Sequence, residues 1–66
     1  PDFHVLSKAY RGMVAEAFSR FITFFVEEGR NINEKNYRGE TILKIVSEHR
    51  NSEEYAKILK QAGAES

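Results

Sequence analysis

The fold is decided by two stretches that lie 34 residues apart, Phe-Ile-Thr-Phe-Phe-Val-Glu-Glu-Gly at residues 21–29 and Tyr-Ala-Lys-Ile-Leu-Lys-Gln-Ala-Gly at residues 55–63. Apolar residues coincide at positions 21/55, 22/56, 24/58 and 25/59 of this alignment, and both stretches end in glycine. A period of roughly 30–40 residues is typical of repeat proteins, in which one unit cannot bury its apolar face and stacks on the next. The alternative is two unrelated amphipathic helices that share a glycine stop.

The first of these stretches belongs to an amphipathic helix that ends at Gly29. Its apolar residues have the spacing i, i+3, i+4, i+7 that places them on one helix face. They are Phe18, Phe21, Ile22 and Phe25. Phe24 and Val26 fall outside this stripe, so the helix is apolar around most of its circumference. We therefore expect it to be covered on more than one side.

The rest of the chain predicts three more helices and one extended segment. Residues 31–41, Asn-Ile-Asn-Glu-Lys-Asn-Tyr-Arg-Gly-Glu-Thr, have no helical period and are rich in turn formers, which predicts an extended turn or a β-hairpin-like finger. Thr41 can cap a short helix, and Asn51 or Ser52 can start a last helix that stops at Gly63. A shorter helix is expected over Phe3–Tyr10. The sequence thus predicts an all-α fold of two helix hairpins joined by one finger.

Composition narrows the class of protein. The 66 residues include ten basic and ten acidic ones, so the net charge is zero and no overall field draws the chain onto nucleic acid or an anionic membrane. No apolar run approaches the roughly 20 residues of a membrane-spanning helix, and the first residues lack a secretory signal pattern. Cysteine is absent, which excludes disulfides and thiolate metal sites. We expect an intracellular protein of the cytoplasm or nucleus.

Three motifs match one known repeat family. Asn36, Gly39, Thr41 and Leu43 fall at the fixed positions of Asp/Asn-x-x-Gly-x-Thr-Pro-Leu-His. Residues 29–33, Gly-Arg-Asn-Ile-Asn, are similar to Gly-Ala-Asp-Val-Asn, and residues 54–59, Glu-Tyr-Ala-Lys-Ile-Leu, to an acidic residue followed by Val-Val-Lys-Leu-Leu. Together these motifs resemble the ankyrin repeat. The resemblance covers residues 29–65, weakens over residues 14–28 and is least over residues 1–13.

The chain also departs from the ankyrin pattern. Ile42 stands where the family has proline, and Lys44 stands where it has a hydrogen-bonding histidine. Residues 1–29 are about seven residues too long for one repeat of this period, and residues 8–13 are the candidate for an enlarged connection. The resemblance implies one module, with an irregular first repeat at about residues 1–33 and a C-terminal capping repeat at about residues 34–66. Lys60 in place of Val26 fits a capping repeat, whose outer face meets water.

The resemblance implies a non-catalytic protein-interaction module, a scaffold that presents its finger and first helices to a partner. The expected partner is another protein or further repeats of the parent chain. Tyrosine and arginine are enriched at interface hot spots, which favours the finger tip as the contact, although Tyr37 packing on a neighbouring finger would explain it as well. The candidate partner-binding residues are Lys35, Tyr37, Arg38, Glu40 and Lys44.

A second candidate surface lies on the Phe-rich helix at residues 14–28. Its large side chains either belong to the core, packed against the second unit, or form a hydrophobic docking surface. The docking alternative predicts a self-associating helical module, a homo-oligomer that dimerises through this helix. The residues concerned are Phe21, Phe24, Phe25 and Val26.

Catalytic chemistry has little support in the sequence. His4 and His49 are the only imidazoles, they are far apart in the chain, and each is expected to be solvated. Motifs for an activated serine, a phosphate-binding loop or a zinc site on one helix are absent from the chain. We therefore expect no enzyme activity, no catalytic residue, no metal and no cofactor.

Overall fold

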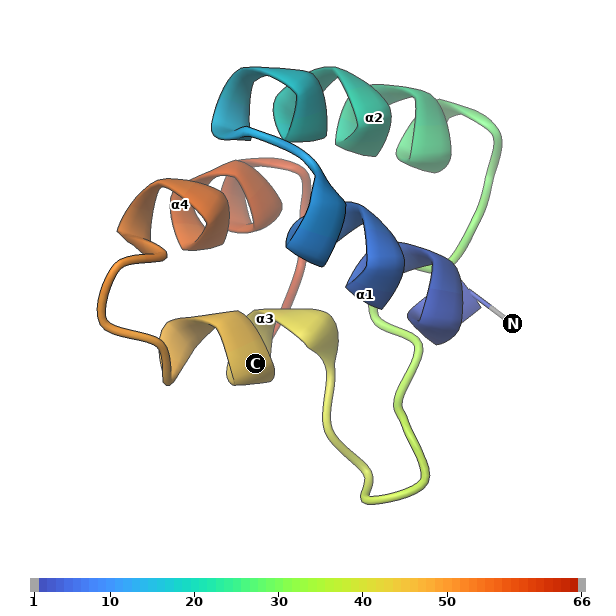
Figure 1. Ribbon diagram of the computed structural model, residues 1–66. Helices are drawn as coiled ribbons and strands as arrows, with labels where there is room; N and C mark the ends of the chain where they lie inside the picture. The colour runs from blue at the N-terminus through green and yellow to red at the C-terminus, as the bar shows by residue number, and fades with distance from the viewer. Residues whose placement is uncertain (1, 66) are drawn as a thin grey trace.

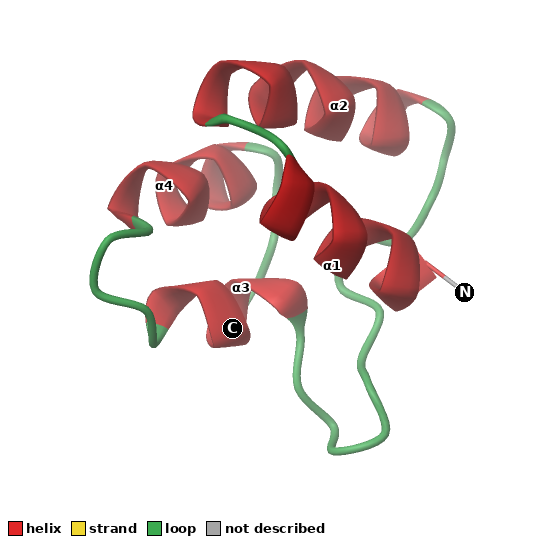
Figure 2. Ribbon diagram, viewed as in Figure 1, coloured by secondary structure: helices red, strands yellow, loops and turns green. Residues whose placement is uncertain are grey.

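The computed structural model describes residues 2–65, which form four helices. They are α1 (Asp2–Gly12), α2 (Ala15–Glu27), α3 (Ile42–Ser47) and α4 (Glu53–Gln61). These residues contain no β-strand, and Figure 2 shows only helices joined by loops. The predicted all-α class and the predicted number of helices are therefore confirmed.

The four helices form two pairs that lie against each other. Within the pairs α1 contacts α2 and α3 contacts α4, and between the pairs α1 contacts α3 and α2 contacts α4 (Figure 1). Each helix of the first pair therefore meets its counterpart in the second. The arrangement has an inner layer, α1 and α3, on the side of the long loop, and an outer layer, α2 and α4.

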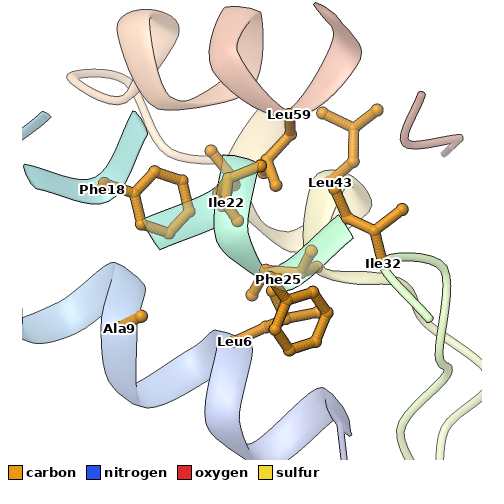
Figure 3. Close-up of a cluster of buried hydrophobic side chains, with 10 residues drawn as sticks. Leu6, Ala9, Phe18, Ile22, Phe25, Ile32, Leu43 and Leu59 are labelled. Atoms are coloured by element: carbon orange, nitrogen blue, oxygen red, sulfur yellow. The ribbon is translucent and has the colours of Figure 1, made fainter. Parts of the chain in front are cut away.

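One apolar core holds these layers together (Figure 3). Every helix contributes to it, and Ile32 of the long loop closes one edge. The largest side chains with less than 2% of their surface exposed are Leu6, Phe18, Ile22, Ile42, Val46 and Leu59. Burying such side chains stabilises a fold by about 1.5–3 kcal/mol each, so these six residues carry much of the packing.

The predicted stripe of α2 is buried as expected, but the helix is not covered on more than one side. Phe18, Ile22 and Phe25 are buried in the core. Phe24 is 65% exposed and Val26 is 38% exposed. Cover for these two side chains does not come from residues 2–65, because α1 and α4 pack on the stripe and leave the opposite face of α2 in solvent.

The ends of α2 and α4 have the same backbone geometry. Gly29 donates its N–H to the Val26 carbonyl at 2.9 Å, and Arg30 donates to the carbonyl of Phe25 at 3.2 Å. The residues 34 positions later repeat this pair, from Gly63 to Lys60 at 3.1 Å and from Ala64 to Leu59 at 2.9 Å. Both glycines have positive φ, +79° and +99°, the conformation that makes glycine the preferred residue after a helix. The two predicted glycine stops are confirmed.

The N-terminus of each helix in the second pair is set by a different contact. The Thr41 hydroxyl accepts a hydrogen bond from the backbone N–H of Lys44 at 3.2 Å, which confirms the predicted cap of α3. Ser52 rather than Asn51 occupies the cap position of α4, but its hydroxyl does not bond to the helix. It bonds to the hydroxyl of Tyr10 on α1 instead.

The first helix pair, residues 2–27, is longer than the second, residues 42–61, for a reason that the sequence interpretation missed. Residues 8–13 do not form an enlarged connection, because residues 8–12 continue α1 and only Met13 and Val14 join α1 to α2. Leu6 and Ala9 are buried on the same face of α1, and Tyr10 packs against this core. Packing along this face extends α1 to 11 residues, against 6 for α3.

Residues 28–41 join the two pairs as a loop without helix or strand. The loop runs away from the helices and turns back (Figure 1). The turn is organised by Asn36, whose side-chain oxygen accepts hydrogen bonds from the backbone of Arg38 and Glu40, both at 2.9 Å. Asn36 also donates its N–H to the Glu40 carbonyl at 2.9 Å. The loop contains no paired β-strands, so the predicted β-hairpin-like finger is not confirmed.

Candidate functional site

A groove lies on the inner layer, between α1, α3 and the long loop. Its volume is about 580 Å³, within the range of roughly 300–1,000 Å³ that is usual for ligand sites. Its apolar lining comes from both inner helices: Phe3 and Tyr10 on α1, and Ile42 and Ile45 on α3. Because these helices belong to different pairs, the groove exists only when the two pairs stack.

Polar side chains surround this apolar lining. His4 and Arg11 extend from α1, Lys35 and Tyr37 belong to the loop, and His49 follows α3; all five are exposed. The groove also contains one carboxylate, Glu34, which accepts a hydrogen bond from the Asn31 side chain at 3.3 Å. This combination of an apolar floor and a polar rim is typical of binding grooves.

The loop places its aromatic residue fully in solvent. Tyr37 is 91% exposed, and the Arg38 guanidinium lies over its ring at 5.6 Å from the centroid. Residues 2–65 contain one long loop, so they do not test the alternative that Tyr37 packs on a neighbouring finger. Of the residues proposed from the sequence, Lys35 and Tyr37 line the groove, and Arg38 lies beside them at the loop tip.

Glu40 and Lys44 lie outside the groove lining and interact with each other. The Lys44 ammonium is 4.0 Å from the Glu40 carboxylate, and it donates a hydrogen bond to Glu48 at 3.0 Å. The hydrogen bond to Glu48 and the charge of that carboxylate raise the pKa of Lys44, with a smaller contribution from Glu40. Lys44 is thus already engaged along α3, which makes it a weaker candidate for partner contact than Lys35.

A polar and aromatic cluster joins the two helix pairs behind the groove, and sequence reasoning missed it. The Tyr10 hydroxyl is 2.7 Å from Nδ1 of His49 and 2.5 Å from the Ser52 hydroxyl. The Tyr10 ring stacks on the His49 ring with centroids 5.8 Å apart. Tyr55 packs edge-on against Tyr10 at 5.3 Å and donates its hydroxyl proton to the Met13 carbonyl at 2.7 Å. His49 is therefore exposed, as expected, but its ring also bonds to Tyr10.

The Phe-rich surface of α2 has a buried part and an exposed part. Phe25 is core, and Phe21 is half-buried with its ring 5.7 Å from that of Phe25. Phe24 and Val26 stay exposed, as does Val14 at 71%. The core alternative therefore holds for Phe25 and in part for Phe21, which packs against the core. The docking alternative stays open for Phe24 and Val26.

Residues 2–65 hold no group of three or more histidine, aspartate or glutamate side chains arranged to bind a metal ion. None of the four helices has the length and apolar character needed to cross a membrane.

Comparison with protein-family models, curated proteins and solved structures finds no match for this chain. The ankyrin resemblance therefore rests on the residues of this chain alone, and the function has to be inferred from the groove and the loop.

Proposed function

We propose that the chain is an ankyrin-type repeat module that binds another protein through the groove and the finger at residues 31–41. The observation that carries this proposal is the groove itself, with an exposed tyrosine at its edge and an apolar floor built from both helix pairs. The matching helix ends at Gly29 and Gly63 support two units of one repeat, at about residues 1–33 and 34–66. In this proposal the chain is an intracellular, non-catalytic scaffold, with neither cofactor nor metal.

Preorganisation of the finger supports a binding role. Its base is held by Asn33, which accepts a hydrogen bond from the backbone of Glu65 at 2.7 Å, and by Thr41, which donates to the Glu65 carbonyl at 2.9 Å. On the other side, Asp2 accepts from the backbone of Asn31 at 2.8 Å. A loop already fixed in this way loses less conformational entropy on binding. The partner then meets side chains in a defined position.

The double variant Tyr37→Ala, Arg38→Ala tests the proposal. Protein segments that bind the wild-type chain are first selected from a displayed library, and their affinities for both chains are then compared. We expect at least a tenfold loss, about 1.4 kcal/mol, because the variant removes an aromatic and an arginine from the contact. The melting temperature should not change, since both side chains are exposed.

The control is Lys57→Ala, which removes an exposed side chain from α4, outside the groove. It should bind the selected segments as the wild type does. If Tyr37→Ala, Arg38→Ala lowers the melting temperature and the affinity together, the loop tip is structural. If no selected segment contacts the groove or finger, the proposed function is wrong.

Self-association through α2 is the second candidate function, and the exposure of Phe24 and Val26 favours it. In this alternative a second copy covers the apolar face that the chain leaves in solvent. Sedimentation velocity from about 1 μM to 1 mM should then show a concentration-dependent dimer, and Phe24→Ser should abolish it. A monomer over the whole range, with folding retained on dilution, would exclude the dimer and leave the groove as the functional surface.

A further inference from the structure

The cations that line the groove lack ion-pair partners, whereas several carboxylates near it have one. Arg11 on α1 and Lys35 on the loop both line it, and neither forms an ion pair with another residue of the 2–65 range. The two histidines of the rim, His4 and His49, add no negative charge. Glu34 is the only carboxylate in the lining, and it bonds to Asn31 within the loop.

The carboxylates on the neighbouring elements are partly compensated, because Glu40 and Glu48 share one cation. Asp2, at the start of α1, accepts from the backbone of Asn31 and lies 3.8 Å from the guanidinium of Arg30. On α3 and its flanks, Lys44 holds Glu40 at 4.0 Å and Glu48 at 3.0 Å. Arg11 and Lys35 therefore have no ion-pair partner within residues 2–65, and these two cations outnumber Glu34, the one carboxylate of the lining. This leaves a local positive charge in a chain whose net charge is zero.

We propose that the groove binds an extended segment of a partner protein in which acidic side chains flank an apolar one. This inference rests on the proposed function and names the class of partner. An apolar side chain fits against the half-buried Ile45 and Phe3, and carboxylates on either side of it meet Arg11 and Lys35. Opposite charges across an interface raise the association rate and select among partners. Arginine also binds a carboxylate in a bidentate geometry.

Three nine-residue peptides test this inference. All three have leucine and phenylalanine at the same positions, and the remaining positions are all Glu in the first peptide, all Gln in the second and all Lys in the third. Their binding is followed by amide shifts in two-dimensional NMR of the labelled chain. We expect the Glu peptide to bind at least about tenfold more tightly than the Gln and Lys peptides. Its shifts should be confined to α1, α3 and residues 34–37. The affinity should fall with added salt, which screens exposed charges over about 10 Å at 0.1 M.

Charge reversal at the groove provides the residue-level test. The double variant Arg11→Glu, Lys35→Glu should bind the Glu peptide about tenfold more weakly than the wild type does. Both side chains are exposed, so folding is retained, and Arg11→Gln, Lys35→Gln is the milder second variant. The matched control, Lys57→Glu, makes the same kind of charge change on α4, outside the groove lining, and should leave the affinity unchanged.

The outcomes separate this inference from the proposed function. If all three peptides bind the groove equally well, the acidic specificity is wrong but a peptide-binding groove stands. If none of them shifts a groove residue, and displayed segments do not either, the proposed function fails. A single-stranded DNA of matched charge that binds the same residues as tightly as the Glu peptide would overturn the choice of a protein partner.

Discussion

Phe18→Ala is expected to remove a large part of the chain's stability at 25 °C. The Phe18 side chain has no exposed surface, and its ring lies 5.2 Å from Tyr55 and 6.3 Å from Tyr10. Removing a buried phenylalanine costs about 3–5 kcal/mol in transfer free energy and cavity formation. A domain of this length has a total stability of only about 3–10 kcal/mol. Urea unfolding followed by circular dichroism measures the change.

Phe24→Ala is the matched control, because it makes the same substitution on the same helix. Phe24 is 65% exposed. The free energy of unfolding of the Phe24→Ala variant should therefore differ from that of the wild type by less than about 0.5 kcal/mol. Both variants are compared at a concentration where the wild type is a monomer. Equal effects at the two positions would mean that α2 does not bury the face described here.

Tyr10→Phe is expected to lower the free energy of unfolding by about 2 kcal/mol without altering the packing of the ring. The variant removes the hydroxyl that lies between His49 and Ser52. Ser52 is only 9% exposed, so its hydroxyl loses a partner that solvent replaces poorly. A loss of about 1 kcal/mol lowers the melting temperature of a domain this small by about 4–8 °C. Thermal unfolding should therefore show a decrease of about 8–16 °C.

Tyr55→Phe provides the comparison for Tyr10→Phe. Its hydroxyl makes one hydrogen bond, to the Met13 carbonyl, and the expected cost is about 1 kcal/mol. Ser52→Ala in the Tyr10→Phe background should add little, because the pair is already broken. If the stability lost in the double variant equals the sum of the losses in Tyr10→Phe and Ser52→Ala, the two residues act independently. The hydrogen bond between the helix pairs then does not contribute to stability.

Local signals in the sequence predicted the elements that depend on local chemistry. Thr41 caps α3 because a threonine side chain there reaches a free backbone N–H of the first turn. Gly29 and Gly63 end their helices because both adopt positive φ. The stripe of α2 was visible from its spacing alone. Each of these features is decided within a few residues, so one chain is enough to identify it.

Contacts between distant residues could not be predicted in this way. Ser52 looked like a helix cap, yet its hydroxyl bonds to Tyr10, 42 residues away. The length of α1 depends on tertiary packing of Ala9, which the sequence period did not reveal. The groove was missed for the same reason, since Phe3 and Ile45 meet only when the helix pairs stack. Of the residues proposed from the sequence, Lys35 and Tyr37 line this groove, whereas Glu40 and Lys44 lie outside it and form an ion pair with each other.

Stacking of the two helix pairs underlies the groove, the finger base and the proposed function. Nuclear Overhauser effects between aromatic rings in solution measure it most directly, because the rings of Tyr10 and Phe18 belong to the first pair and that of Tyr55 to the second. With centroids 5.3 Å and 5.2 Å from Tyr55, the Tyr10–Tyr55 and Phe18–Tyr55 pairs should both give clear cross-peaks. Cross-peaks between Tyr10 and Phe18 alone, with none to Tyr55, would contradict a stacked arrangement.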